Sequence, residues 1–183
     1  MRPGFRRLIV ATVVAVTVGG TLWALDHFRN NPRVFTEAVR RADKVVLYEG
    51  LPHQFFEKRL LEEERRTKAV VELDGYPFYQ EPLPLAAQDA EYLSELLSDP
   101  AAYQPWKGEK LCGGFHPDYA VEWHVGTSRY RALVCLGCGE FQLSRPGFWA
   151  RTKRYEMNLA TGESLVQRIG SYRKHRPRGS PQD

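Results

Sequence analysis

The pattern of apolar and polar positions sets one uncharged run near the N-terminus apart from the rest of the chain. Residues 8–25, LIVATVVAVTVGGTLWAL, contain no charged side chain. A helix of this length would extend about 27 Å, close to the roughly 30 Å hydrocarbon core of a bilayer. The pattern therefore predicts a single membrane-spanning anchor at 8–25, preceded by a basic tail at 1–7.

Two alternatives to an uncleaved anchor remain open. A cleaved export signal has the same basic start, but its apolar run is shorter and ends at an A-x-A-like site, whereas the best site here is Val18-Gly19-Gly20. A buried helix of a water-soluble core normally has a polar face, and this run offers only threonines. Arg2, Arg6 and Arg7 favour an N-terminus retained inside and a domain on the extracytoplasmic side, although the basic residues between 29 and 44 favour the reverse.

The apolar spacing after residue 26 alternates between helical and strand periods. Helical spacing predicts four helices, over 32–43, 54–66, 86–98 and 159–172, and β-branched runs predict strands over 44–49 and 67–73. Three prolines in 76–85 predict an extended loop. The helix at 54–66 should bury its apolar side, which consists of Phe55, Phe56, Leu60 and Leu61.

A second group of strands shows strict alternation. Tyr119–Val125 and Tyr130–Leu136 flank Gly126, and pairing Val125 with Tyr130 gathers the apolar residues on one face and leaves the other face mostly polar. Residues 141–143 add a possible third strand. A hairpin this tight is antiparallel, so the sequence predicts one α+β domain over 26–172, followed by a disordered basic tail over 173–183.

Charge and motifs exclude several classes of function. The net charge of +4 is modest, and no face combines basic residues with stacking aromatics, so no nucleic-acid site is expected. The sequence has no nucleophile elbow, phosphate-binding loop, dinucleotide fingerprint or zinc-protease helix. His116 and Asp118 flank a proline without a nucleophile beside them. The chain is therefore expected to be non-enzymatic.

One cluster carries possible chemistry: Cys112, His116, Cys135 and Cys138. Continuing the hairpin pairing places His116 level with Cys138, and a glycine-rich turn can bring Cys112 toward both other cysteines. Three interpretations compete: a disulfide from Cys112 to Cys135 or Cys138, a structural zinc held by all four residues, or buried thiols without a special role. A catalytic C-x-x-C is a minor fourth, because such a pair should begin a helix.

The same residues carry a resemblance. Residues 112–119, CGGFHPDY, followed by Cys135-Leu136-Gly137-Cys138, resemble a pattern in small bacterial proteins without an established activity. The resemblance implies a bacterial origin and a shared domain, and it transfers no function. The sequence thus predicts a membrane-tethered, non-enzymatic binding or structural domain without a cofactor, which contacts lipid through 8–25 and an unknown protein partner. A metal-binding or thiol-redox protein is the alternative.

Overall fold

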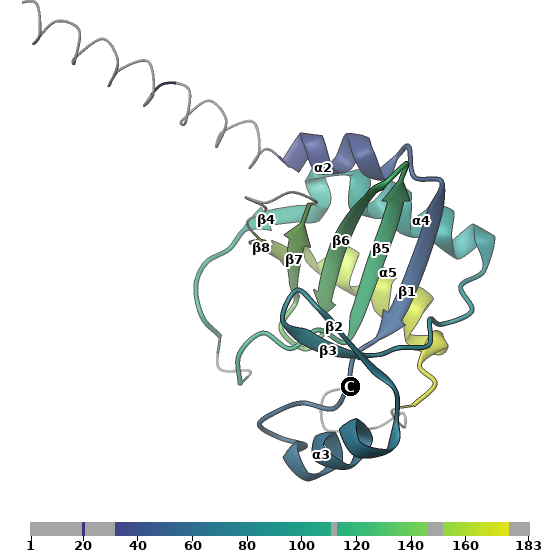
Figure 1. Cartoon of the computed structure of the whole chain (residues 1–183). Helices are drawn as coiled ribbons and strands as arrows, with labels where there is room; N and C mark the ends of the chain where they lie inside the picture. The colour runs from purple at the N-terminus through teal and green to yellow at the C-terminus, as the bar shows by residue number, and fades with distance from the viewer. Residues whose placement is uncertain (1–19, 21–31, 111–112, 146–151, 176–183) are drawn as a thin grey trace, which may run out of the picture.

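The computed structural model describes residue 20 and residues 32–110, 113–145 and 152–175. Within these ranges the chain forms a six-stranded antiparallel sheet in the order β1-β5-β6-β7-β8-β4, with a separate two-stranded ribbon, β2-β3 (Figure 1). The sheet strands are β1 (Lys44–Glu49), β4 (Tyr103–Pro105), β5 (Tyr119–Val125), β6 (Ser128–Cys135), β7 (Glu140–Ser144) and β8 (Lys153–Met157). The ribbon consists of β2 (Val70–Leu73) and β3 (Tyr76–Tyr79).

Four α-helices lie in the described residues: α2 (Pro32–Val39), α3 (Lys58–Thr67), α4 (Ala87–Ser98) and α5 (Leu159–Ile169). Short 3₁₀ turns, η1 (Pro100–Ala102) and η2 (Gly170–Tyr172), follow α4 and α5. The α+β class, the antiparallel sheet and the four helices of the domain are therefore confirmed. The predicted basic tail at 1–7 and anchor at 8–25 lie outside the described residues, apart from Gly20, and no described helix is long and apolar enough to cross a membrane.

Three helices cover one face of the sheet and form the main core with it. Trp123 is fully buried there, its ring packs edge-on against Phe35 of α2 at 5.7 Å, and its Nε1 donates to Ser94 of α4. Leu93 and Leu97 of α4 and two residues of α5 complete the helical side. Burial of these side chains, at about 1.5–3 kcal/mol each, is what holds the helices to the sheet.

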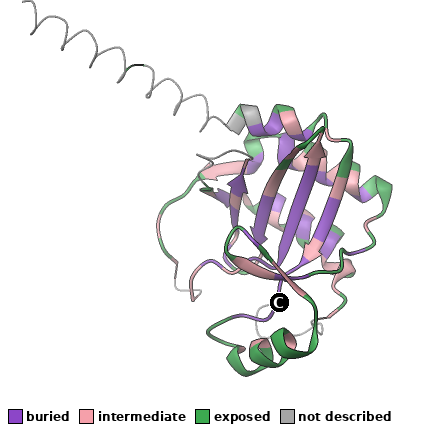
Figure 2. Cartoon of the chain, viewed as in Figure 1, coloured by how far each residue is buried: buried purple, intermediate pink, exposed green. Residues whose placement is uncertain are grey.

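The opposite face of the sheet is also covered, which corrects the expectation of a mostly polar face. Leu73 and Phe78 of the ribbon pack over Ala120, Leu133 and other residues of β5 and β6 to form a second, smaller core. Figure 2 shows the central strands buried along most of their length. Small residues such as Ala120 let the ribbon lie close to the sheet, and the sequence pattern of one hairpin could not reveal this cover.

The register of the β5–β6 hairpin differs by two residues from the predicted one. Val125 pairs with Ser128, and Trp123 pairs with Tyr130 rather than Ala132. The loop is therefore only Gly126-Thr127, and Gly126 takes a positive φ of 55°, which suits the tight turns that follow the natural twist of a hairpin. A shift of two residues keeps each side chain on its predicted face.

Several boundaries were predicted wrongly. The extended loop at 76–85 contains β3, whose ladder partner is β2 and whose other edge has one isolated bridge, from Phe78 to Gly50; there Pro77 needs only to accept, from the Leu51 amide at 3.2 Å. The helix predicted at 32–43 ends at Val39. By Asp43 the chain has already joined the sheet, because the Asp43 amide donates to the His124 carbonyl of β5 just before β1 begins. Strands β4 and β8, three and five residues long, carry no clear alternation and were not predicted.

Candidate functional site

The two cysteines of the C-x-x-C motif lie in the turn between β6 and β7. Cys135 ends β6 opposite Glu140, and Cys138 follows in the turn; both side chains are buried. The Cys138 amide donates a hydrogen bond to Cys135 Sγ at 3.2 Å. Gly139 closes the turn with a φ of 63°, which an L side chain rarely adopts. The structure therefore confirms that these two cysteines lie together.

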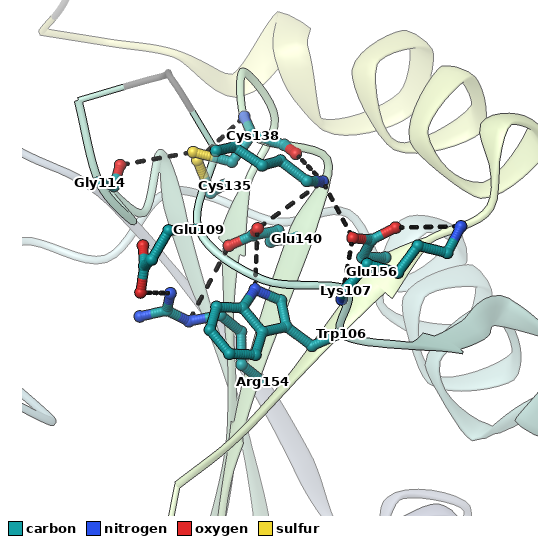
Figure 3. A network of polar contacts seen from close by, with 10 residues as sticks. Trp106, Lys107, Glu109, Gly114, Cys135, Cys138, Glu140, Arg154 and Glu156 are labelled. Carbon is teal, nitrogen blue, oxygen red and sulfur yellow. Dashed lines mark hydrogen bonds and ion pairs between the residues drawn. The ribbon is translucent and has the colours of Figure 1, made fainter.

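A glycine-rich segment lies against this turn. Gly113 and Gly114 both have positive φ, and the Gly114 carbonyl accepts a hydrogen bond from Cys138 Sγ at 3.5 Å. Cys135 and Cys138 are not joined to each other by a disulfide. Figure 3 shows both sulfur atoms on the side of the turn that faces Gly114. Cys112 lies outside the described residues, so its part in a disulfide or a metal site stays a prediction.

His116 is directed toward the loop after β1. Its Nε2 lies 2.8 Å from the Leu51 carbonyl oxygen, and its ring packs at a tilt against His53, with the ring centroids 4.6 Å apart. Because a carbonyl only accepts, Nε2 of His116 carries a proton. Nδ1 of His53 is an acceptor, because the amides of Phe55 and Phe56 donate to it.

The predicted four-residue cluster is thus only partly assembled by the residues that can be seen. Over 32–110, 113–145 and 152–175, no three His, Cys, Asp or Glu side chains are grouped so that they could hold a metal ion. His116 therefore does not join Cys135 and Cys138 in such a group. The hairpin pattern correctly predicted at which end of the sheet His116 lies. The direction of its ring is set instead by the contact with the Leu51 carbonyl.

A network of buried charges lies beside the cysteine turn, and the sequence reasoning missed it (Figure 3). Glu140 and Glu156 face each other across β7 and β8, and their residues are only 2% and 9% exposed. Lys110 Nζ lies 3.7 Å from both carboxylates and donates to the Cys138 carbonyl at 2.7 Å. Lys110 therefore joins the charge network to the cysteine turn.

Further groups donate hydrogen bonds to the carboxylates of Glu140 and Glu156 or lie close to them. The Trp106 indole donates to Glu140, and the Lys107 amide donates to Glu156, both at 3.2 Å. Arg154 Nε lies 3.9 Å from Glu140, and its guanidinium covers the Trp106 ring at 5.1 Å. Such a satisfied network fixes the 106–110 segment on the sheet and needs no ligand to explain it. No sequence signal pointed to it, because it depends on β8.

The C-terminal segment contacts the same end of the sheet. The buried Glu49 carboxylate accepts hydrogen bonds from the amides of Lys174 and His175, and the His175 ring stacks on Tyr79 at 4.0 Å. Arg173 lies 3.7 Å from Asp118, whose other oxygen accepts from the Leu136 amide. Residues 173–175, which the sequence analysis placed in a disordered tail, therefore pack on the domain.

Burial also changes the acidity of one core residue at this end of the sheet. Burial raises the pKa of the Tyr119 hydroxyl to about 12, although the neighbouring Arg173 guanidinium acts in the opposite direction. The hydroxyl therefore stays protonated at any physiological pH and contributes no charge to the region.

Comparisons with protein-family models, with curated proteins and with solved structures find no match to this chain. The resemblance carried by residues 112–119 and 135–138 accordingly stays an expectation from the sequence.

Proposed function

We propose that this chain is a membrane-tethered, non-enzymatic domain that binds a protein partner through α3 and the turn before it. The proposal rests on one observation: apolar side chains that the sequence predicts to be buried are exposed. Phe55, Phe56 and Leu60 are 66%, 62% and 36% exposed, and α3 contributes no buried residue to the domain. These three side chains are called the α3 patch below. Large apolar side chains exposed within one short segment are a feature of protein interaction sites.

The α3 patch is held in position by the rest of the domain. The turn before α3 is closed by a hydrogen bond from the Glu57 amide to the His53 carbonyl at 2.8 Å, and a second bond, from the Leu61 amide to the Glu57 carbonyl at 2.9 Å, leads into the helix. The His53 ring supports Phe56 at 4.6 Å. α3 itself is attached by polar contacts, including one from the Tyr79 hydroxyl to Glu64. α3 is exposed along nearly its whole length, and only Leu61 and Glu64 are partly covered (Figure 2).

The chemistry around the α3 patch fits a protein groove better than a lipid surface. Charges of both signs flank the apolar side chains, with Glu62, Glu63 and Glu64 consecutive, and acidic runs are repelled by anionic headgroups. α3 also lies at the opposite end of the domain from α2, the helix that follows the predicted anchor (Figure 1). A groove on a partner protein can accept apolar side chains presented by a helix and the turn before it, as Phe55, Phe56 and Leu60 are here.

Photo-crosslinking in cells tests the partner surface. With a photoreactive residue at position 60 of the full chain, we expect one dominant cross-link to another protein. The pair Phe55→Ser and Phe56→Ser should weaken it at least about tenfold, as the loss of an aromatic anchor does. Leu159→Ser, at an isolated residue that is 79% exposed, is the matched control and should leave the cross-link unchanged. Cross-links only to lipid or to a second copy of this chain would overturn the proposal.

The tether is tested separately by alkaline carbonate extraction. The full chain should stay in the membrane pellet, because residues 8–25 carry no charge. Val14→Arg with Val16→Arg places two charges near the centre of the run, at about 2.5–3.5 kcal/mol each, and should release the domain. Intact wild-type protein in the supernatant would contradict the anchor.

A further inference from the structure

We propose that the end of the domain beside α2 docks on anionic lipid headgroups of the membrane in which residues 8–25 are anchored. The surface concerned consists of four exposed basic residues, Arg40, Arg41, Lys44 and Arg129, which are called the basic edge below. The proposal rests on the membrane tether of the proposed function and adds a second contact with the membrane. The basic edge is separate from the α3 patch, because α3 lies at the opposite end of the domain (Figure 1).

The fold brings together basic residues that are far apart in the sequence. Lys44 of β1 pairs with His124 of β5, and His124 pairs with Arg129 of β6, so the three form one row across the sheet. Neighbouring strands are about 4.8 Å apart, which places the backbones of Lys44 and Arg129 about 10 Å from each other. Arg40 and Arg41 lie between the end of α2 and Lys44 and therefore reach the same edge.

The basic edge keeps a positive excess after its local contacts are considered. Arg129 lies 3.8 Å from the buried Glu122, but its side chain is 66% exposed, and Arg131 contacts the same carboxylate more closely. Asp43 is exposed, and its carboxylate accepts a backbone amide of the β5–β6 turn at 2.9 Å. Within the described part of the chain, Asp43 and Glu37 are the exposed carboxylates of α2 and the segment up to β1, and the four cations outnumber them.

The sequence places the basic edge within reach of the lipid surface. Only residues 26–31 separate the predicted anchor from Pro32, the first residue of α2, and the connecting chain spans at most about 25 Å when fully extended. α2 itself lies across the end of the domain that carries the β5–β6 turn (Figure 1). A Lys or Arg near an anionic surface strengthens binding by about fivefold, and this attraction acts within about 8–10 Å. Four such residues next to the anchor therefore favour a docked domain.

Photo-crosslinking of the full chain in lipid nanodiscs provides the test. A photoreactive residue at position 127, which is exposed in the β5–β6 turn, reports contact between the basic edge and lipid. In nanodiscs that contain phosphatidylglycerol, its cross-link to lipid should exceed that in pure phosphatidylcholine by at least about fivefold, the effect of one basic residue. The same photoreactive residue at position 60, before the middle of α3, should cross-link equally weakly to both lipids.

Charge reversal separates the basic edge from the net charge of the chain. The edge variant carries three substitutions, Arg41→Glu, Lys44→Glu and Arg129→Glu, and should lose the excess in anionic nanodiscs. The control variant makes the same change in net charge on exposed residues of α3 and should retain the excess. It carries Lys58→Glu, Arg59→Glu and Arg66→Glu.

Equal cross-linking of position 127 to both lipids, or an anionic excess that the edge variant retains, would overturn the proposal. If the edge variant does not fold, the salt dependence of the wild-type cross-link decides. At about 1 M salt the Debye length falls to about 3 Å, so the cross-link should drop to its level in phosphatidylcholine, and a cross-link that resists salt would refute an electrostatic contact. A chain that does not enter nanodiscs would overturn the tether and the docking together, whereas a tethered chain with equal cross-linking overturns the docking alone.

Discussion

Replacing Arg131 with methionine is expected to lower the free energy of unfolding by about 3 kcal/mol, because it leaves a buried carboxylate without its main partner. Arg131 lies on β6 and contacts Glu122 of β5 at 2.5 Å and Asp74 of the ribbon at 2.7 Å. Glu122 is only 1% exposed, so water cannot replace the guanidinium. Methionine retains the packing of the side chain and removes the charge. Urea unfolding of the full chain in detergent measures the loss.

The exposed pair Arg65–Glu72 supplies the matched control. Its atoms are 3.2 Å apart, but its side chains are 49% and 54% exposed, so Arg65→Met should change stability by less than about 1 kcal/mol. Adding Glu122→Gln to Arg131→Met removes the stranded charge and should recover part of the loss. Equal effects of the buried and exposed arginines would show that burial does not decide the strength of the pair.

The same pair sets a pH dependence. Burial alone would raise the pKa of Glu122, but the hydrogen bond and charge of Arg131 outweigh it and lower the pKa below its usual 4.5. The stabilisation is therefore fully present above about pH 4.5 and is lost as the pH falls through the lower, folded-state pKa. In Arg131→Met only His124 and Arg129 still oppose the effect of burial, so the Glu122 pKa should be higher than in the wild-type chain. The destabilisation of this variant should accordingly be larger at pH 7 than at pH 4.

The Glu122–Arg131–Asp74 contact also explains how the ribbon is held over the sheet. Asp74 sits at the tip of the β2–β3 turn with a φ of 53°, and its second oxygen accepts from Ser144 of β7. One side chain of the turn therefore joins two strands of the sheet. This polar attachment complements the apolar contacts of Leu73 and Phe78 beneath the ribbon.

Local patterns were sufficient to predict those elements whose neighbours lie close in the sequence. The strand at 44–49, the helix at 86–98 and the alternating hairpin carry their own periodicity, so their types are confirmed. The ribbon over the second face, by contrast, depends on contacts between residues about 60 positions apart, such as Arg131 and Asp74. No periodicity reports such a contact.

The candidate site followed the same division. Cys135 and Cys138 are three residues apart on one turn, so their proximity could be predicted from spacing. The direction of His116 could not, because it depends on the Leu51 carbonyl, 65 residues earlier in the chain. The Glu140–Glu156 pair was missed because β8 has only five residues and no clear alternation.

Gly50→Ala is the second substitution with a large expected effect, a loss of about 3 kcal/mol in the free energy of unfolding. A Cβ at this position would lie 2.1 Å from the Pro117 carbonyl oxygen, which is backbone and cannot rotate away. The Gly50 amide also donates to the Asp118 carbonyl at 2.8 Å, so the two segments cannot separate without losing this bond. Thermal and urea unfolding of the full chain would both report the loss.

Gly162→Ala is the control that separates the crowding at Gly50 from the general effect of replacing a glycine. Gly162 lies inside α5, and a Cβ there would meet nothing within 4 Å. Alanine should therefore stabilise the chain by about 0.5–1 kcal/mol, because it restricts the unfolded state and favours the helix. Opposite signs for the two substitutions would attribute the Gly50 effect to its contact with Pro117. If Gly50→Ala left the free energy of unfolding unchanged, the backbone at 116–118 would have to move away from the added Cβ at little cost. The position of His116, and of the hydrogen bond from the Leu136 amide to Asp118, would then not be fixed by Gly50.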